Sequence, residues 1–320
     1  KQEICRYLYR RFDVSYNPDS EVMVTVGGSE AIDIALRAMC DPGDEVLIPQ
    51  PSYVSYVPCT MLAGGKPVVI ELEEKDNFKL TPEKLLAKIT DKTKILVMPF
   101  PNNPTGAIMT KEDLAPIVDI IIEKDLFVIS DEIYSELTYG TDHVTIAAFP
   151  GMKDRTILIN GFSKSYAMTG WRLGYAAAPH RILEQMLKIH QFAIMCAPTT
   201  SQYAAVSALR DGDNDVQMMR EAYDQRRRFV LHAFKEMGLD CFEPEGAFYA
   251  FPSIKRFGMT SDEFATRFLR EEKVAVVPGT AFGASGEGFL RVSYAYSLKN
   301  LKEALGRMAN FVKRLDEERK

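Results

Sequence analysis

Short apolar runs alternate with longer helical stretches from Glu21 to about residue 178, and this alternation constrains the fold more than any other feature of the sequence. Each run has the length and the β-branched composition of a strand. Strands that alternate with helices are typical of βα units, which join into a largely parallel sheet. The predicted strands are VMVTV (22–26), EVLIP (45–49), PVVIEL (67–72), KILVMP (94–99), LFVIS (126–130), TILIN (156–160) and LGYAAA (173–178). We therefore predict an α/β fold whose larger part contains a seven-stranded, mostly parallel sheet.

Helices are predicted before the first strand and between later ones. They cover the opening residues 1–12, with Ile4, Tyr7, Leu8 and Phe12 on one face, and the stretches 31–39, 81–89 and 111–124. Thr81 and Thr110 are expected to begin the last two, because a Thr side chain caps a helix N-terminus.

The pattern changes after Tyr203. A charged stretch around Gly212 predicts a turn and then one long helix, and shorter strands follow at 247–251, 274–278 and 289–295 before a closing polar helix. We therefore predict a large domain at residues 1–212 and a smaller C-terminal α/β domain at residues 213–320.

Composition excludes several classes of function. Lys plus Arg (39) against Asp plus Glu (44) leaves a net charge of −5, which would not attract a nucleic acid. No apolar run approaches the length of a membrane span, and no leader opens the printed sequence. The five cysteines form no CxxC pair and the four histidines no HExxH motif, so we expect a cytoplasmic protein without a metal site.

Unusual polar residues follow four of the predicted strands. Gly28 and Ser29 follow the first, the segment FPNNPTG (100–106) follows the fourth, Asp131 follows the fifth, and Lys164 follows the sixth. Ligands of open parallel α/β sheets bind beyond the carboxyl ends of the strands. We therefore expect these residues to line one site.

Gly28, Ser29 and Glu30 would begin a helix and present free backbone N–H groups to an anion such as a phosphate. An ordinary βα turn with Ser29 as the helix cap is the alternative. Arg172 could approach the same anion with two parallel hydrogen bonds.

Asp131 follows an apolar strand, where a carboxylate is costly unless it is paired. Tyr134, about one helical turn further on, could bring its hydroxyl to the same place. Asn103 is forced toward an extended conformation because it precedes Pro104. A helix cap or an ion pair with a neighbouring basic residue for Asp131, and a simple turn for Asn103, are the structural alternatives.

Lys164 is surrounded in sequence by apolar and aromatic residues, and burial there would favour the neutral, nucleophilic amine. Tyr53 could lay its ring over a flat cofactor or could pack in the core. Arg291, in the apolar strand FLRVSYA, needs an anionic partner, either a substrate carboxylate or an internal acid.

Together these residues match the needs of pyridoxal 5′-phosphate, which binds a Schiff-base lysine and pairs its ring nitrogen with an acidic side chain. The segments VTVGGSEA, PQPSYVSY, PNNPTG, SDEIYSELTY, NGFSKSYAMTGWRLGY and GFLRVSYA occur in the order found in class I/II aminotransferases of the fold type I pyridoxal-phosphate enzymes, and the chain resembles that family over essentially its whole length. The segments GAFYAFPSIKRFGMTSDEF and VAVVPG resemble the bacterial aromatic and N-acetyl-diaminopimelate branch most.

The resemblance implies transfer of an amino group between an L-amino acid and a 2-oxo acid such as 2-oxoglutarate. It implies an aromatic or N-acetyl-L,L-diaminopimelate-like donor, with aspartate as a further option, and a homodimer. It assigns catalysis to Lys164, Asp131 and Tyr134, substrate binding to Asn103 and Arg291, and cofactor binding to Gly28, Ser29, Glu30, Tyr53, Asn103, Asp131, Tyr134, Ser163, Lys164 and Arg172. Lys164 would also move the proton between the substrate α-carbon and the cofactor.

The sequence departs from the family pattern in two ways. Gly161 stands where many relatives carry a phosphate-binding Ser, and the segment that precedes the first helix in relatives is not in the printed sequence. The alternatives are a pyridoxal-phosphate-dependent C–S lyase and a non-catalytic module that senses the cofactor. The sequence does not fix the amino donor, the activity of this shortened chain, or the residues that a second subunit would add.

Overall fold

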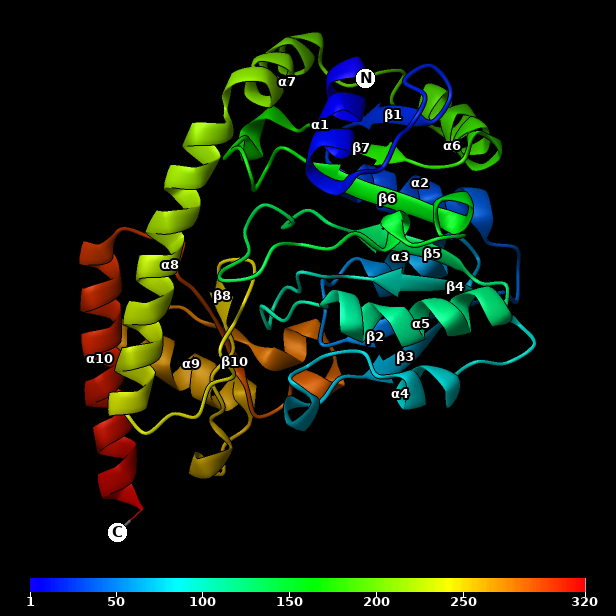
Figure 1. The fold of residues 1–320 in the computed structure, drawn as a ribbon. Coiled ribbons are helices and arrows are strands. Elements are labelled where there is room, and N and C mark those ends of the chain that lie inside the picture. Colours follow the sequence, from blue (N-terminus) through cyan, green and yellow to red (C-terminus); the bar gives the residue numbers. More distant parts are fainter. Residues whose placement is uncertain (320) are drawn as a thin grey trace.

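The computed structural model describes residues 1–319, and its larger part is built on one seven-stranded sheet (Figure 1). The strands are β1 (Val22–Thr25), β2 (Glu45–Gln50), β3 (Lys66–Glu71), β4 (Thr93–Met98), β5 (Phe127–Asp131), β6 (Thr156–Gly161) and β7 (Gly174–Ala177), in the order β1-β7-β6-β5-β4-β2-β3. Every predicted strand of this part is present, within one or two residues of its expected ends.

Only β7 runs against the other strands of this sheet. It pairs antiparallel with both β6 and β1, whereas the remaining pairs are parallel. The carboxyl ends of β1 to β6 therefore lie at one edge, and the residues just before β7 join them there. The predicted mostly parallel sheet is confirmed.

Helices cover both faces of the sheet (Figure 1). They are α1 (Gln2–Phe12), α2 (Gly28–Met39), α3 (Tyr56–Leu62), α4 (Pro82–Leu86), α5 (Lys111–Glu123), α6 (His180–Ala193) and α7 (Thr199–Asp211). Side chains of a strand alternate between the faces, so Ile95 and Val97 of β4 pack with α2 and α6, whereas Leu96 and Met98 pack with α5. Near β6 and β7, Leu158 and Tyr175 pack with α1 and α7.

The expected helix starts are largely as predicted. Thr110 caps α5 with a reciprocal bond to Asp113, and Thr81 caps α4. Helix α4 ends at Leu86, earlier than expected, and α2 begins at Gly28, earlier than the predicted residue 31. Helices α6 and α7 follow β7 and are additions to the predicted elements. No helix in residues 1–319 is both long enough and apolar enough to cross a membrane.

The C-terminal part begins with the long helix α8, which lies beside α10 (Figure 1). Its elements are α8 (Asp213–Glu236), β8 (Tyr249–Ala250), α9 (Ser261–Glu272), β9 (Val277–Pro278), β10 (Leu290–Ser293) and α10 (Leu298–Glu318), with an antiparallel sheet in the order β8-β10-β9. The strands lie inside the predicted ranges, and α8 begins one residue after Gly212.

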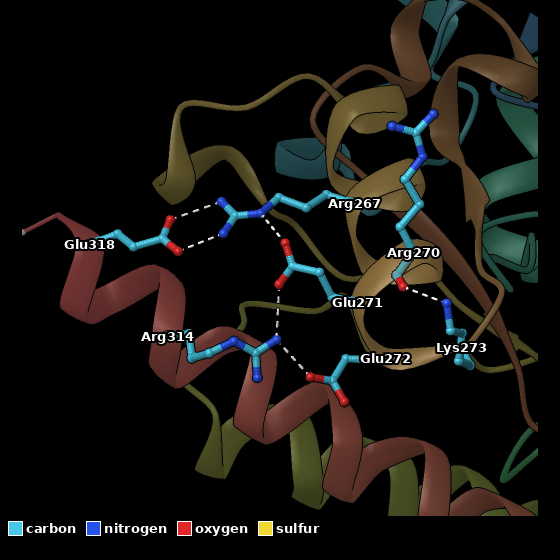
Figure 2. A network of polar contacts seen from close by, with 7 residues as sticks. All are labelled: Arg267, Arg270, Glu271, Glu272, Lys273, Arg314 and Glu318. Atoms are coloured by element: carbon cyan, nitrogen blue, oxygen red, sulfur yellow. Dashed lines mark hydrogen bonds and ion pairs between the residues drawn. The ribbon is translucent and has the colours of Figure 1, made fainter.

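An ion-pair network joins α9 to α10 (Figure 2). Arg267 pairs with Glu271 and Glu318, and Arg314 pairs with Glu271 and Glu272. Beneath this network the two helices pack through Phe264, Phe268 and Phe311. Because exposed ion pairs contribute little stability singly, the aromatic contacts hold the two helices together more strongly.

Four glycines meet at the carboxyl edge, where they allow very close packing of backbones. Gly174 of β7 lies opposite Gly161 of β6 and Thr25 of β1. A Cβ at Gly174 would lie 2.6 Å from the carbonyl carbon of Gly27 and 2.7 Å from the nitrogen of Gly28. The turn that begins α2 can therefore reach the sheet only because position 174 lacks a side chain.

We predict that Gly174→Ala lowers the melting temperature, because overpacking of this kind costs about 1–3 kcal/mol. Gly170→Ala is the matched control, since no atom lies within 4 Å of a Cβ built there. Thermal unfolding followed by circular dichroism measures both variants. Equal melting temperatures for the two would contradict the close-packing argument.

Candidate active site

A cavity of about 290 Å³ opens at the carboxyl edge of the large sheet, where the C-terminal part meets it. It is lined by every predicted site residue except Glu30: Gly28, Ser29, Tyr53, Asn103, Asp131, Tyr134, Ser163, Lys164, Arg172 and Arg291. Further lining residues are Ile32, Tyr56, Pro99, Pro101, Ile133, Thr169 and Tyr249. The expectation that the strand ends converge on one place therefore holds for residues separated by more than 250 positions in the sequence.

Glu30 lies outside the cavity lining, which differs from the prediction. Its carboxylate accepts a hydrogen bond from the Val26 N–H and lies 2.6 Å from Nδ1 of His190 in α6. The side chain thus satisfies a backbone group at the start of α2 and joins α2 to α6. A cofactor contact from Glu30 could come only from its backbone.

One end of the cavity is suited to an anion. Helix α2 begins there at Gly28, with Ser29 in its first turn. The Arg172 guanidinium lies beside it, since a Cβ built at Gly27 would be 2.6 Å from Arg172 Nη2. Arg172 reaches this edge because it comes just before the antiparallel strand β7. A helix N-terminus and a guanidinium together favour a phosphate.

The glycine at position 161 has a structural explanation. A Cβ there would lie 3.0 Å from both Gly174 Cα and the Leu173 carbonyl oxygen. A serine would therefore crowd the β6–β7 pair in this chain. Ser163 lines the cavity two residues later and can offer a hydroxyl at the same end.

Asp131 ends β5 and is only 7% exposed. Its Oδ2 accepts a 2.7 Å hydrogen bond from the Tyr56 hydroxyl, and its Oδ1 accepts a 3.2 Å bond from the Ile133 N–H. Burial raises the pKa of Asp131, and these two hydrogen bonds oppose the rise. Tyr56 was not a predicted site residue, although it stands one helical turn after Tyr53 in the same segment.

Lys164 lies between the anion end and the C-terminal part. Its Nζ is 5.6 Å from the centre of the Phe248 ring and 6.0 Å from that of Tyr134. Burial lowers the pKa of Lys164, and the charges of Arg291 and Arg172 lower it further. The amine is therefore neutral over a wider pH range than that of an ordinary lysine.

Arg291 lies on β10 and reaches the cavity from the C-terminal part. Its Nη1 donates a 2.9 Å hydrogen bond to Asn103 Oδ1, and its Nε is buried without a partner. The guanidinium carbon lies 4.4 Å from the centre of the Tyr249 ring and 4.7 Å from that of Phe282. Within residues 1–319 no carboxylate pairs with Arg291, so the alternative of an internal acid is not met.

Two tyrosines contact other predicted site residues. The Tyr134 hydroxyl lies 3.1 Å from the Tyr249 hydroxyl, and the Tyr53 hydroxyl lies 3.3 Å from Ser29 Oγ. The roles of Tyr249 and Phe282 lay beyond the sequence reasoning, because they depend on how the second sheet packs against the first.

Four charged groups thus line one cavity without an ion-pair partner in the described part of the chain. They are Asp131, Lys164, Arg172 and Arg291. Asp131 is buried, Lys164 and Arg291 are half-buried, and Arg172 is exposed. Removal of charge from water is costly unless the charge is compensated, so this cost concerns the first three groups. The donor set fits pyridoxal phosphate together with an amino acid, because these ligands bring a phosphate, a ring nitrogen, an aldehyde and a carboxylate.

Comparison with known proteins gives consistent matches. The sequence profile of the family described as aminotransferase class I and II matches residues 1–308. The Bacillus subtilis protein YugH, whose name gives no substrate, is 52% identical over 98% of this chain and 81% of its own length. The aspartate aminotransferase of Pyrococcus abyssi is 47% identical over 96% of this chain and 80% of its own length. The solved structure of an aromatic aminotransferase from Pyrococcus horikoshii has a TM-score of 0.96 and 46% identity, covering 98% of this chain and 84% of that one.

We predict that Lys164→Met raises the melting temperature of the cofactor-free protein at neutral pH. The lowered pKa of Lys164 means that its charged form is disfavoured in the folded state, and Met removes that charge. As pH rises from the lowered folded pKa toward the ordinary lysine pKa, folded wild-type Lys164 loses its proton. The difference in melting temperature between Lys164→Met and the wild type should therefore shrink.

Thermal unfolding of both proteins across this pH range tests the prediction. Lys313→Met is the control, because Lys313 is exposed in the later half of α10, away from the start of the helix. A Lys164→Met advantage that grows with pH, or that Lys313→Met reproduces, would show that the charge of Lys164 is not penalised by folding.

Proposed function

The chain belongs to the class I and II aminotransferases, and we propose that Lys164, Asp131 and Arg291 carry the chemistry of this pyridoxal-phosphate-dependent enzyme. The observation on which the proposal rests is that these groups line one cavity and that none of them has an ion-pair partner among residues 1–319. When bound, pyridoxal phosphate supplies an aldehyde that reacts with amines and a pyridinium ring that withdraws electrons.

We propose that the anion end of the cavity holds the phosphate. Gly28 and Ser29 provide the start of α2, and Arg172 provides a guanidinium that no acidic side chain occupies. Ser163 adds a hydroxyl. The Tyr53 ring is proposed to lie over the cofactor, with its hydroxyl held near Ser29.

Asp131 is proposed to keep a proton on the ring nitrogen. Its own burial works against ionisation, whereas the Tyr56 hydroxyl and the Ile133 N–H favour the ionised form. A protonated ring nitrogen opposite the carboxylate would supply the positive charge that stabilises the ionised form of Asp131. Tyr134 and Asn103 are proposed to donate hydrogen bonds to the phenolate oxygen of the cofactor.

Lys164 is proposed to move the substrate proton. Because its pKa is lowered, Nζ can exist as a free amine and accept the proton of the substrate α-carbon. It can then donate this proton to the carbon of the cofactor that takes up the amino group. Arg291 orients the substrate by binding its carboxylate, with Asn103 fixing the Nη1 side of the guanidinium. Orientation of this kind contributes a large part of catalysis in enzymes.

An aromatic amino donor is the substrate that the described cavity supports best. Once Arg172 holds a phosphate and Arg291 an α-carboxylate, the cavity lining has no further free guanidinium for the second carboxylate of aspartate. Apolar and aromatic groups such as Ile32, Tyr56 and Tyr249 line the rest. N-acetyl-L,L-diaminopimelate, a long donor with a second charged end, is the next candidate, and 2-oxoglutarate is the proposed acceptor.

We predict that the cofactor-loaded enzyme converts L-Phe and L-Tyr faster than L-Asp or N-acetyl-L,L-diaminopimelate. Rates of the first half-reaction, measured by cofactor absorbance and by release of the 2-oxo acid, give the order. Arg291→Gln should lower kcat/KM for every donor roughly 10- to 100-fold, because hydrogen bonds to a charged group are lost. Faster reaction of L-Asp would overturn the aromatic preference, and no reaction with any donor would overturn the assigned roles.

A homodimer is proposed from an exposed apolar patch beside the site. Phe192, Met195 and Tyr203 are 93%, 79% and 75% exposed, and Trp171 is 48% exposed. Ser201 Oγ donates a 2.7 Å hydrogen bond to the Trp171 carbonyl oxygen, which brings the start of α7 next to Trp171. Exposed apolar surface of this kind is typical of an interface. The five free cysteines support a cytoplasmic location.

We predict that Phe192→Glu weakens self-association at least about tenfold, because a buried aromatic at an interface commonly contributes 2 kcal/mol or more. Analytical ultracentrifugation over a concentration series measures the dissociation constant. Leu269→Glu on α9 is the matched control, since it places the same charge at another exposed apolar position. A monomeric wild type, or an equal effect of both variants, would contradict this interface.

A further inference from the structure

Tyr249 contacts two residues of the site that come from different parts of the fold. Its ring lies 4.4 Å from the guanidinium carbon of Arg291, and its hydroxyl lies 3.1 Å from that of Tyr134. Tyr249 is only 7% exposed. It thus contacts both Arg291 and Tyr134.

The pairing of the small sheet produces the first contact. Tyr249 of β8 lies directly opposite Ser293 of β10. Arg291 is two residues before Ser293 and therefore lies on the same face of β10. Diagonal neighbours on one face are within reach when one is aromatic and the other long.

The ring of Tyr249 limits how Arg291 can bind a ligand. Together with Phe282 it places two aromatic rings within 4.7 Å of the guanidinium carbon. Asn103 occupies Nη1, and the buried Nε has no partner. Nη2 donates to no described group and therefore remains for a carboxylate, which would form a charge-assisted hydrogen bond there.

The hydroxyl of Tyr249 influences which way the proton of Tyr134 points. Two buried hydroxyls in contact share one hydrogen bond, so only one of them donates to the other. Burial raises the pKa of both tyrosines and the charge of Arg291 lowers both, but the Arg291 guanidinium lies against the ring of Tyr249. We therefore take Tyr249 as the donor of the pair. If Tyr249 donates, the proton of Tyr134 is left for an acceptor in the cavity that Tyr134 lines.

We propose that Tyr249 is a positioning residue with two separable parts: its ring holds Arg291 in place for the substrate carboxylate, and its hydroxyl holds Tyr134 as a donor toward the cavity. This inference rests on the proposed roles of Arg291 and Tyr134. It links the carboxylate site of the C-terminal part to the cofactor site of the large sheet through one side chain.

The cofactor-loaded enzyme gives two measurements that separate these parts. The dissociation constant of 3-phenylpropionate, a carboxylate without an amino group, reports on Arg291. The pH midpoint of the visible absorbance of the bound cofactor reports on Tyr134, because loss of a donor to an anionic oxygen raises the pH at which the protonated form is lost.

Tyr249→Phe keeps the ring, so we expect an unchanged dissociation constant. We expect a raised pH midpoint, because Tyr134 no longer accepts a hydrogen bond from Tyr249 and its own hydroxyl becomes a weaker donor. Tyr249→Leu removes both parts, and we expect the same midpoint shift and a dissociation constant about tenfold higher, the size of a buried cation–π contact. Phe282→Leu is the matched control for the ring, with weaker carboxylate binding and an unchanged midpoint. In a Tyr134→Phe background, Tyr249→Phe should shift the midpoint no further.

Each part of the proposal can fail separately. If Tyr249→Leu binds 3-phenylpropionate like the wild type, the ring does not position Arg291. A Tyr249→Phe midpoint that falls, stays unchanged, or shifts equally in the Tyr134→Phe background overturns the role of the hydroxyl. Equal affinity in Arg291→Gln and wild type would instead refute the proposed carboxylate site. Melting temperatures of all variants, with the conservative Tyr249→Phe as reference, exclude misfolding as the cause.

Discussion

Charge held in a cavity without an ion-pair partner is the constraint on which the site depends. Asp131 is buried, and Lys164 and Arg291 are half-buried. Asp131 accepts hydrogen bonds from neutral groups, and Arg291 donates one to Asn103. Such an arrangement destabilises the empty protein, because burial disfavours the charged forms of Asp131 and Lys164. Ligands that bring the opposite charges would remove that penalty. This relief would contribute to their binding free energy.

The large sheet makes this arrangement possible. Parallel strands deliver Asp131 and Lys164 to the same edge, and the one antiparallel strand adds Arg172, which precedes it. Close packing of Gly161 and Gly174 leaves room for the turn that begins α2. The second sheet then contributes Arg291 from the opposite side of the cavity.

Much of the fold and of the site could be predicted from the sequence, and there is a physical reason why the rest could not. Strand composition and alternation are local properties, so the strands and the convergence of Asp131 and Lys164 at their ends followed from the sequence. The partners of these residues did not, because Tyr56, Tyr249 and Phe282 take their places through packing between distant segments. The side-chain partner of Glu30 was not predictable for the same reason: it is His190 of α6, a helix that the sequence pattern did not reveal.

The hydrophobic core crosses the boundary proposed at Gly212. Tyr134 and Leu137, from the segment after β5, belong to the same cluster of buried side chains as Phe264 and Phe311 of the C-terminal helices. Phe251 and Phe289 of the C-terminal part in turn join the cluster that contains Leu96 and Val128. Units that share their cores lose stability together, so the two parts are expected to behave as one cooperative folding unit, and the gene is poorly suited to division into independently folding halves.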